Sequence, residues 1–298
     1  MIETTELLYV KYRRQAEALR KCVMMSPEAF SGFLEDALSG MQQIAVEYKG
    51  CTGVLFYDVY EESGKTFCYV PAYGYYAENE QMMVRLFQRL AEEAVREKPV
   101  EFSVNLYAND DECIRALHMM QFGNMAEKGL AELPESVEIP RLPYDIRPLS
   151  KAEIEALWED VWAATSRIVS HLQKSPVFYP GTEFTEDVYR DFYMGDDVEV
   201  IAAFDAGKLV GIIEWNLDAA RLLCGEKSVD VGEAYVVPEL RGSGLAEALL
   251  LTAEKRAKDA GYDYMWVEHG TANPNARGFW NKHFQTFQYE LTRTIEHA

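Results

Sequence analysis

The succession of helical and extended hydrophobic patterns in this chain occurs twice, at an offset of about 163 residues. The helical pattern of residues 82–94 falls on that of residues 245–257, and the alternating pattern of residues 102–107 falls near residues 265–270. With 298 residues and a hydrophobic content of 48%, the chain is long and apolar enough for each copy to bury a core of its own. The sequence therefore predicts two similar α/β domains.

The first half begins with helical spacing and then changes to strand alternation. Residues 1–25 have apolar side chains three and four positions apart, and a second helix is predicted from Ser26, a good N-cap residue, with Pro27 in its first turn. The patterns that follow are strands at 43–48, 51–60 and 66–71, a helix at 81–96, a strand at 100–107 and a helix at 110–120. This half is expected to end near Ala131.

A proline-rich stretch separates the two halves. It contains Pro134, Pro140, Pro143 and Pro148, and proline both fixes φ and removes a backbone donor. We predict an interdomain linker at 133–143, a first domain at 1–132 and a second domain at 144–298. The second domain is expected to open with a strand at 144–147.

The second half repeats the order of the first. Ser150 and Glu153 have the spacing of a capping box at the start of a helix over 151–164. The predicted elements after it are a helix at 185–193, strands at 198–205, 208–217 and 228–237, a helix at 246–258, a strand at 264–269, a helix at 275–282 and a strand at 289–295.

A glycine-bearing turn joins the strand at 228–237 to the helix that follows it. Gly242 and Gly244 allow a tight turn, and the start of the helix directs unpaired N–H groups and a partial positive charge toward it. Such a turn can bind a phosphate, with Arg241 adding charge, or it can be a structural turn without a ligand. The spacing does not match a Walker loop or a dinucleotide fingerprint.

This turn resembles the acyl-CoA pyrophosphate loop of the GNAT superfamily of N-acetyltransferases. In that family the loop reads Gln or Arg, two residues, Gly, one residue, then Gly or Ala, and Arg241, Gly244 and Ala246 fill these places. The resemblance implies two tandem GNAT-like domains, each a mixed, mostly antiparallel sheet flanked by helices with a splayed parallel strand pair. It also implies that acetyl-CoA binds the C-terminal copy through the loop and first helical residues Arg241, Gly242, Ser243, Gly244, Leu245 and Ala246.

The N-terminal copy departs from this pattern at the corresponding place. Residues 78–83 replace the glycines with larger side chains, and Glu78 and Glu80 stand where the arginine would be. Carboxylates repel a pyrophosphate. We therefore expect the N-terminal copy to be degenerate and not to bind acetyl-CoA there.

The resemblance also implies where the thioester lies. In the family, the pantetheine arm lies between two splayed parallel strands, which here are those at 228–237 and 264–269. Backbone groups of Val236 and Val237 would bond the arm and polarise the thioester carbonyl, and such a donor contributes about 3 kcal/mol toward a developing oxyanion.

Glu233 precedes these valines in the same strand pattern. Family members often have an acidic residue here that acts as a base through water. Such a base is needed because an alkyl amine with a pKa near 10 is nearly all protonated at neutral pH, which costs about 4 kcal/mol. Glu233 also fits a solvated or ion-paired strand glutamate.

The family's closing motif is Asn, two residues, Ala, three residues, Tyr. Asn273 and Ala276 match it, and Asn273 is expected to hydrogen-bond the pantetheine while Asn275 can cap the helix. Trp280 replaces the tyrosine that often protonates the leaving thiolate, and an indole N–H is not an acid at neutral pH. His283 lies one helical turn later and can substitute, although a lone histidine is more often structural. The thiolate can also leave without a dedicated acid.

The acceptor pocket is described only weakly by the sequence. Glu214 and Glu268 can hold a cation, and the aromatic side chains that can line an apolar wall are Trp162, Tyr179, Phe184, Tyr189 and Tyr193. The same aromatic cluster fits a core or a domain interface.

Charge and cysteine content limit the partners and the compartment. A formal net charge of −20 disfavours nucleic acid and anionic membranes, and it suits a cationic substrate, although acidity also serves solubility. Five scattered cysteines without Cys-x-x-Cys spacing predict neither a disulfide framework nor a metal site. With no signal-peptide layout and no apolar stretch near the roughly 20 residues of a membrane span, a cytoplasmic location is expected.

Together these features predict an acetyl-CoA-dependent N-acetyltransferase. The acceptor would be a primary amine of a small molecule or peptide, which attacks the thioester directly with Glu233 as base. The alternative is a catalytically idle acyl-CoA-binding regulatory protein. The sequence leaves open the acceptor, the acyl-chain preference and the oligomeric state.

Overall fold

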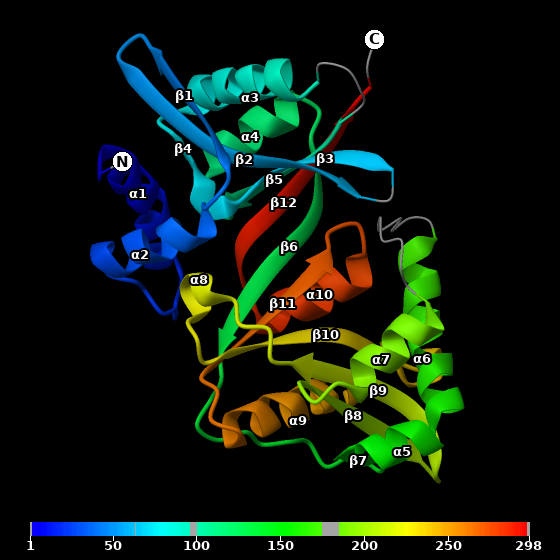
Figure 1. Cartoon of the computed structure of the whole chain (residues 1–298). Coiled ribbons are helices and arrows are strands. Elements are labelled where there is room, and N and C mark those ends of the chain that lie inside the picture. Colours follow the sequence, from blue (N-terminus) through cyan, green and yellow to red (C-terminus); the bar gives the residue numbers. More distant parts are fainter. Residues whose placement is uncertain (1, 63, 96–99, 175–184, 297–298) are drawn as a thin grey trace. The chain divides into compact units, whose positions relative to one another are not determined.

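The computed structural model describes residues 2–62, 64–95, 100–174 and 185–296. The chain divides into two compact units. Unit 1 comprises Met1–Lys128 and Gln285–Ala298, and unit 2 comprises Gly129–Phe284. Figure 1 shows the elements of each unit in sequence colours. No helix within the described ranges is long and apolar enough to cross a membrane.

Unit 1 is a mostly antiparallel sheet with helices packed on it. Its strands follow the order β1-β2-β3-β5-β12, with β4 paired to β2, and the β3–β5 pair is parallel. The strands are β1 (Gln42–Tyr48), β2 (Cys51–Glu62), β3 (Lys65–Val70), β4 (Tyr75–Ala77), β5 (Val100–Tyr107) and β12 (Gln285–Ile295). The helices are α1 (Ile2–Ala18), α2 (Pro27–Ala37), α3 (Glu80–Ala94) and α4 (Asp111–Met119), with the short turn η1 (Ala72–Gly74) before β4.

Local chemistry accounts for the helix starts in unit 1. Ser26 caps α2 by accepting from the Ala29 N–H, as the sequence predicted. The amphipathic helix α3 buries five side chains, namely Met82, Met83, Leu86, Phe87 and Leu90. The Phe87 ring packs edge-on against Phe102 of β5, so the apolar face of α3 covers the sheet.

Unit 2 has the same plan. Its strands follow the order β11-β10-β9-β8-β7, in which only the β10–β11 pair is parallel among the pairings described. The strands are β7 (Asp145–Pro148), β8 (Val198–Asp205), β9 (Lys208–Asn216), β10 (Ser228–Val236) and β11 (Tyr264–Gly270). The helices are α5 (Lys151–Ala156), α6 (Trp158–Gln173), α7 (Glu186–Met194), α8 (Arg221–Cys224), α9 (Leu245–Asp259) and α10 (Pro274–His283), with the turn η2 (Pro238–Leu240) between β10 and α9.

The two faces of the unit 2 sheet bury different cores. One core joins alternate strand residues such as Ile213 and Val231 to α9 and α10. The other joins the intervening residues, such as Ile212 and Tyr235, to α5, α6 and α7. The sheet therefore lies between two helical layers, with α9 on one side and α6 and α7 on the other (Figure 1).

The predicted fold class is confirmed, since each unit is a mixed, mostly antiparallel sheet flanked by helices. The capping box of Ser150 and Glu153 is present, but the helix expected at 151–164 is broken at Leu157 into α5 and α6. The strand expected at 289–295 begins earlier, at Gln285, and it belongs to unit 1 rather than to the second half of the chain.

Two strands were not predicted from the sequence patterns, the three-residue β4 and the longer β6. Strand β6 (Gly123–Glu132) starts in unit 1 and ends in unit 2. Its sequence, Gly-Asn-Met-Ala-Glu-Lys-Gly-Leu-Ala-Glu, is rich in residues that are rare in strands. Strand pairing, a tertiary effect, overrides the local propensity here.

Candidate active site

Strands β10 and β11 begin as a parallel pair and then part. The paired positions run from Ser228–Tyr264 to Asp230–Trp266 and stop there, although both strands continue. Strand β10 changes course at this place, because a bulge shifts its register against β9 between Val231 and Ala234. The result is the splayed parallel pair that the sequence predicted in unit 2.

The backbone of Val236 faces the side of β10 where β11 has parted. The Val237 N–H donates to the Val210 carbonyl at 2.9 Å, so it is directed toward β9. Successive N–H groups of a strand point to opposite edges, and the Val236 N–H is therefore directed toward β11. Backbone groups of Val237 were also expected to bond the pantetheine arm, but the Val237 N–H is already bonded to β9.

The glycine turn after β10 has the conformation that its residues require. Gly242 and Gly244 both have positive φ, at 79° and 88°. Arg241 donates from Nε to the Val236 carbonyl at 3.3 Å, which ties the turn to the end of the strand. Residues 241–244, including Ser243, are exposed to solvent.

Helix α9 starts at this turn without a side-chain cap. Its N-cap is Gly244, and the helical hydrogen bonds open with the Ala248 N–H donating to the Gly244 carbonyl at 3.0 Å. Leu245 is fully buried and anchors the first turn in the core, while Ala246 is half-buried. The N–H groups of the first turn lack helical partners, and no side chain of the N-cap occupies them.

Helix α10 (Pro274–His283) is capped by Asn273 rather than by Asn275. The Asn273 carbonyl oxygen Oδ1 accepts from the Ala276 N–H at 3.3 Å, so Asn273 is the N-cap and the expectation for Asn275 was wrong. Asn273 is 7% exposed, and this bond leaves its Nδ2 group to donate elsewhere.

Trp280 is a core residue. Its side chain is 5% exposed and packs against the rings of Phe279 and Phe284. Burial lowers the pKa of His283, which keeps this imidazole neutral near pH 7. Its buried Nε2 has no hydrogen-bond partner among the described residues.

Glu233 lies within the β10 bulge and contacts α7. Its Oε1 accepts from the Tyr189 hydroxyl at 2.6 Å, and its backbone N–H donates to Glu214 Oε1 at 3.0 Å. Burial, followed by the charge of Glu233, raises the pKa of Tyr189. Tyr189 therefore stays protonated and acts as a donor that orients this carboxylate.

The Glu214 carboxyl lies beneath the bulge, next to Gly232, which has no side chain. A Cβ on Gly232 would approach Glu214 Oε1 to 1.9 Å, so the Glu214 carboxyl occupies the space that a side chain at position 232 would need. Burial and the nearby Glu233 raise the pKa of Glu214 well above its usual value. Gly232 was not singled out from the sequence, although it stands directly before Glu233.

Aromatic side chains of α6 and α7 cover this region. The Trp158 and Trp162 rings are stacked at 6.4 Å, and the Trp162 ring lies 6.1 Å from Tyr189. Tyr193 is fully buried and shares a hydrogen bond with Thr165, so it belongs to the core. Tyr179 and Phe184, named with them in the sequence analysis, lie outside the described residues.

In unit 1, side chains form hydrogen bonds at the start of α3 and beside the parallel pair β3–β5. Helix α3 is capped by Asn79, whose Oδ1 accepts from the Met82 N–H at 3.1 Å. Between β3 and β5, the Asn105 amide donates to the Val70 carbonyl at 3.4 Å. The Tyr75 hydroxyl accepts from the backbone N–H of Tyr107 and donates to Asp110. Lys11 pairs with the same carboxylate, and the whole cluster is buried.

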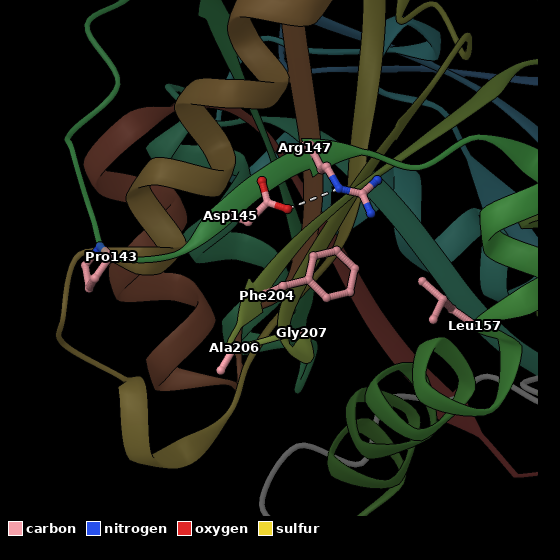
Figure 2. A pocket seen from close by; sticks show the side chains of 7 residues that line it. All are labelled: Pro143, Asp145, Arg147, Leu157, Phe204, Ala206 and Gly207. Carbon is pink, nitrogen blue, oxygen red and sulfur yellow. Dashed lines mark hydrogen bonds and ion pairs between the residues drawn. The ribbon is translucent and has the colours of Figure 1, made fainter.

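A hollow of about 430 Å³ lies elsewhere in unit 2, beside β7 and the turn between β8 and β9 (Figure 2). Its lining residues are Pro143, Asp145, Arg147, Leu157, Phe204, Ala206 and Gly207. Arg147 is already paired with Asp145 and Glu153, and its guanidinium lies over the Phe204 ring. None of these residues belongs to the glycine turn or to the β10 bulge. Within the described ranges no group of acidic, histidine or cysteine side chains is arranged to hold a metal ion.

Comparisons with known proteins agree with this architecture. A family model, described as the acetyltransferase (GNAT) family, matches residues 158–284. A search of curated proteins gave no match. Among solved structures, the chain is similar to a GCN5-related N-acetyltransferase from Sphaerobacter thermophilus, with a TM-score of 0.59, 15% identity, and coverage of 98% of this chain and 91% of that chain. This likeness supports a GNAT acetyltransferase fold over the whole chain.

Two further solved structures are similar at lower scores. One is a tandem GNAT protein from the clavulanic acid biosynthesis pathway, with a TM-score of 0.48 and 11% identity, covering 100% of this chain and 97% of that chain. The other is a GCN5-related N-acetyltransferase from Kribbella flavida, with a TM-score of 0.45 and 13% identity, covering 88% of this chain and 93% of that chain.

Proposed function

We propose that unit 2 transfers an acetyl group from acetyl-CoA to a primary amine. The observation that carries this proposal is the combination of a parallel strand pair that parts after Asp230, a Val236 N–H directed to the parted side, and an uncapped helix that starts immediately after a glycine turn. An extended pantetheine arm needs the first two features, and a pyrophosphate needs the third.

The pyrophosphate would bind at the start of α9. The first-turn N–H groups and the helix dipole attract phosphate oxygens, and the exposed turn from Arg241 to Gly244 gives them access. Arg241 adds a positive charge beside the turn. The Val236 N–H would then donate to the thioester oxygen, where charge develops during attack.

Glu233 is the proposed base. The acceptor ammonium loses a proton to Glu233, directly or through water, and the amine nitrogen attacks the carbonyl carbon of the thioester. The tetrahedral intermediate collapses with loss of the CoA thiolate, and the nitrogen releases its remaining extra proton to water, which yields the neutral amide. Tyr189 holds the Glu233 carboxylate in place by its short hydrogen bond.

Neither of the two side chains considered as an acid for the leaving thiolate, Trp280 and His283, supplies a proton. Trp280 is packed in the core and donates no proton at neutral pH, and burial keeps His283 neutral. A thiol has a pKa of about 8.5, so the thiolate can depart unprotonated and take a proton from water. We propose this course for the last step.

Unit 1 is proposed to be a copy that does not bind acetyl-CoA. Asn79 already satisfies the start of α3, and Tyr75 and Asn105 occupy the hydrogen-bonding groups between its strands. A pantetheine arm would have to displace these buried bonds, each of which is costly to leave unmade.

Binding is tested by titrating acetyl-CoA calorimetrically into the protein and into Gly244→Asp. The substitution places a carboxylate at the phosphate end of α9, and we expect affinity to fall at least about tenfold. The matched control is Gly261→Asp at the other end of the same helix, where φ is also positive and no atom lies within 4 Å of an added Cβ. The control has the same backbone strain and should bind normally; equal affinities for both variants would refute the site.

Turnover is tested by following release of the CoA thiol with a panel of amines. For Glu233→Gln we expect unchanged acetyl-CoA affinity and a rate lower by about 10²- to 10⁴-fold. An unaltered rate would remove Glu233 as the base. Binding of acetyl-CoA without release in the presence of any amine would instead indicate an idle acyl-CoA-binding regulatory protein.

A further inference from the structure

Two shielded carboxyl groups of unit 2 each have an oxygen without a hydrogen-bond partner among the described residues. They are Oε2 of Glu214 and Oδ1 of Asp230. The Glu214 side chain is 2% exposed, and its other oxygen accepts from the Glu233 N–H. A buried polar atom that is left unsatisfied is costly, and two of them in neighbouring carboxyls call for an explanation.

The two carboxyls lie close together on the face of the sheet that α6 and α7 cover. Asp230 pairs across the ladder with Asn216, whose amide donates to Asp230 Oδ2 at 3.3 Å, and Glu214 is two positions from Asn216 on the same strand face. Asp230 is near enough to raise the pKa of Glu214 by charge repulsion. Glu233 acts on both groups, so the three carboxyls form one cluster.

Among the residues that the structure describes, no cation compensates this cluster. Within the described residues, no ion pair joins Glu214, Asp230 or Glu233 to a lysine, arginine or histidine. Arg167 of α6 is directed elsewhere, since it donates to the Tyr235 hydroxyl at 2.9 Å. The neighbour from α7 is Tyr189, which is neutral and bonded to Glu233.

Resting on the proposed function, we propose that Glu214 and Asp230 form a subsite for a second ammonium group of the acceptor, so that the substrate is a diamine or polyamine. An ammonium group has three donors and one positive charge, which would satisfy both unpartnered oxygens and neutralise the cluster. Glu233 lies three residues beyond Asp230 on the same strand, so a second nitrogen of the same molecule would lie near the base, within about 10 Å.

The cluster makes binding depend on pH. Burial, together with the charges of Asp218, Glu268 and Glu233, raises the pKa of Asp230 to about 7, while the Asn216 amide opposes this. Burial and the charge of Glu233 also raise the pKa of Glu214 on β9. The groups that face the cluster from α7 are Tyr189 and Tyr193, while Arg167 of α6 is bonded to Tyr235 instead. Because a bound ammonium favours the ionised carboxyl, diamine affinity should rise from pH 6 to pH 8, and binding should release protons.

The test is calorimetric titration of the full chain, without acetyl-CoA and at low salt, with linear diamines of three to six carbons and with monoamines of equal length. We expect the best diamine to bind at least about tenfold more tightly than its monoamine. Asp230→Asn keeps the side-chain shape and should abolish this preference and flatten its pH dependence. The control is Glu226→Gln, which removes one charge at an exposed residue paired only with Arg221 among the described ion pairs, and it should keep the preference.

Glu214→Gln is the second variant, and it should also lose the preference for diamines; circular dichroism establishes that each variant is folded. Equal binding of diamines and monoamines, or an unchanged preference in Asp230→Asn, would overturn the proposal. Tight binding of Mg²⁺ that displaces the diamine and requires Asp230 would also overturn it, in favour of a metal site.

The subsite and the proposed function can fail separately. Diamine binding that needs Asp230, without acetyl transfer to any amine, would support the subsite and refute the enzyme. Acetyl transfer with equal KM values for monoamines and diamines would support the enzyme and refute the subsite.

Discussion

Gly232 is the residue on which the geometry of the bulge depends most directly. Its missing side chain is the space that the Glu214 carboxyl occupies, and the Glu214 oxygen in turn binds the N–H of Glu233. A glycine and two glutamates therefore determine one another across β9 and β10. The absence of a side chain at Gly232 therefore helps to set the position of Glu233, the proposed base.

Gly232→Ala is expected to destabilise the protein by about 1–3 kcal/mol, because an added Cβ at 1.9 Å from Glu214 Oε1 forces the carboxyl to move. Urea denaturation followed by circular dichroism measures the free energy of unfolding. The control is Gly278→Ala inside α10, where no atom lies within 4 Å of an added Cβ; this change should be neutral or stabilise by up to about 1 kcal/mol. A Gly232→Ala variant as stable as the wild type would show that the carboxyl is not confined.

At the scale of elements, α3 and α9 occupy corresponding places in the two copies of the repeat, but their N-termini differ. Both pack an apolar face on their sheet, but α3 is capped by Asn79 and α9 starts at Gly244. A capped helix has used part of its N-terminal hydrogen-bonding capacity, whereas an uncapped one retains it for a ligand. One position at the helix start thus separates two otherwise similar elements.

Helix α9 also carries a buried acid, Glu254, which is 8% exposed. Burial raises its pKa from 4.5 to about 7. A carboxyl whose pKa is raised in the folded state binds more protons in the folded protein than in the unfolded protein. Its contribution to the free energy of unfolding is therefore most favourable below pH 4.5 and is lost as the pH rises to about 7. The free energy of unfolding of the wild type should therefore fall between these pH values, and we expect Glu254→Gln to reduce that fall by on the order of 2 kcal/mol.

The measurement compares free energies of unfolding at pH 5 and pH 8 for both proteins. Asp259→Asn is the control, since Asp259 is an exposed residue at the end of the same helix, paired with Lys255. Only Glu254→Gln should alter the difference between the two pH values. Parallel pH curves for wild type and Glu254→Gln would contradict the expectation.

At the scale of the whole molecule, the order of residues along the chain does not coincide with the division into units. Strand β12 closes the sequence, yet it pairs with β5 of unit 1 over positions 288–295. Further bonds tie its start to the same unit, since Gln285 bonds Arg20 and the Ala18 carbonyl. The N-terminal unit is therefore complete only when the C-terminal strand is present.

Truncation after Phe284 should accordingly unfold unit 1 and spare unit 2. Loss of β12 removes a full ladder of strand pairs and exposes buried residues of β5, such as Val104, which pairs with Leu291 of β12. Limited proteolysis with mass spectrometry should detect early cleavage in residues 4–128, while acetyl-CoA affinity changes little. Cleavage confined to residues 129–284 would contradict this assignment of the strand.

Much of the fold follows from local patterns. Most helices and strands were predicted within a few residues, because hydrophobic periodicity and caps such as Ser26 and Ser150 are local signals. Strand β6 and the placement of β12 were not, because both depend on pairing with distant segments. The proposed site residues were chosen from motif spacing, whereas Asp230 and Gly232 carry no local signal that distinguishes them from ordinary strand residues.

The sequence was sufficient for the repeat, the glycine turn and the chemistry of the residues around it, since each depends on neighbours along the chain. Only the tertiary structure decided that β10 and β11 part after Asp230, that the Val236 N–H is directed to the open side, and that Glu214 lies beneath Glu233. These features arise where strands distant in sequence meet. Their geometry is set by pairing, bulging and burial, which no local pattern encodes.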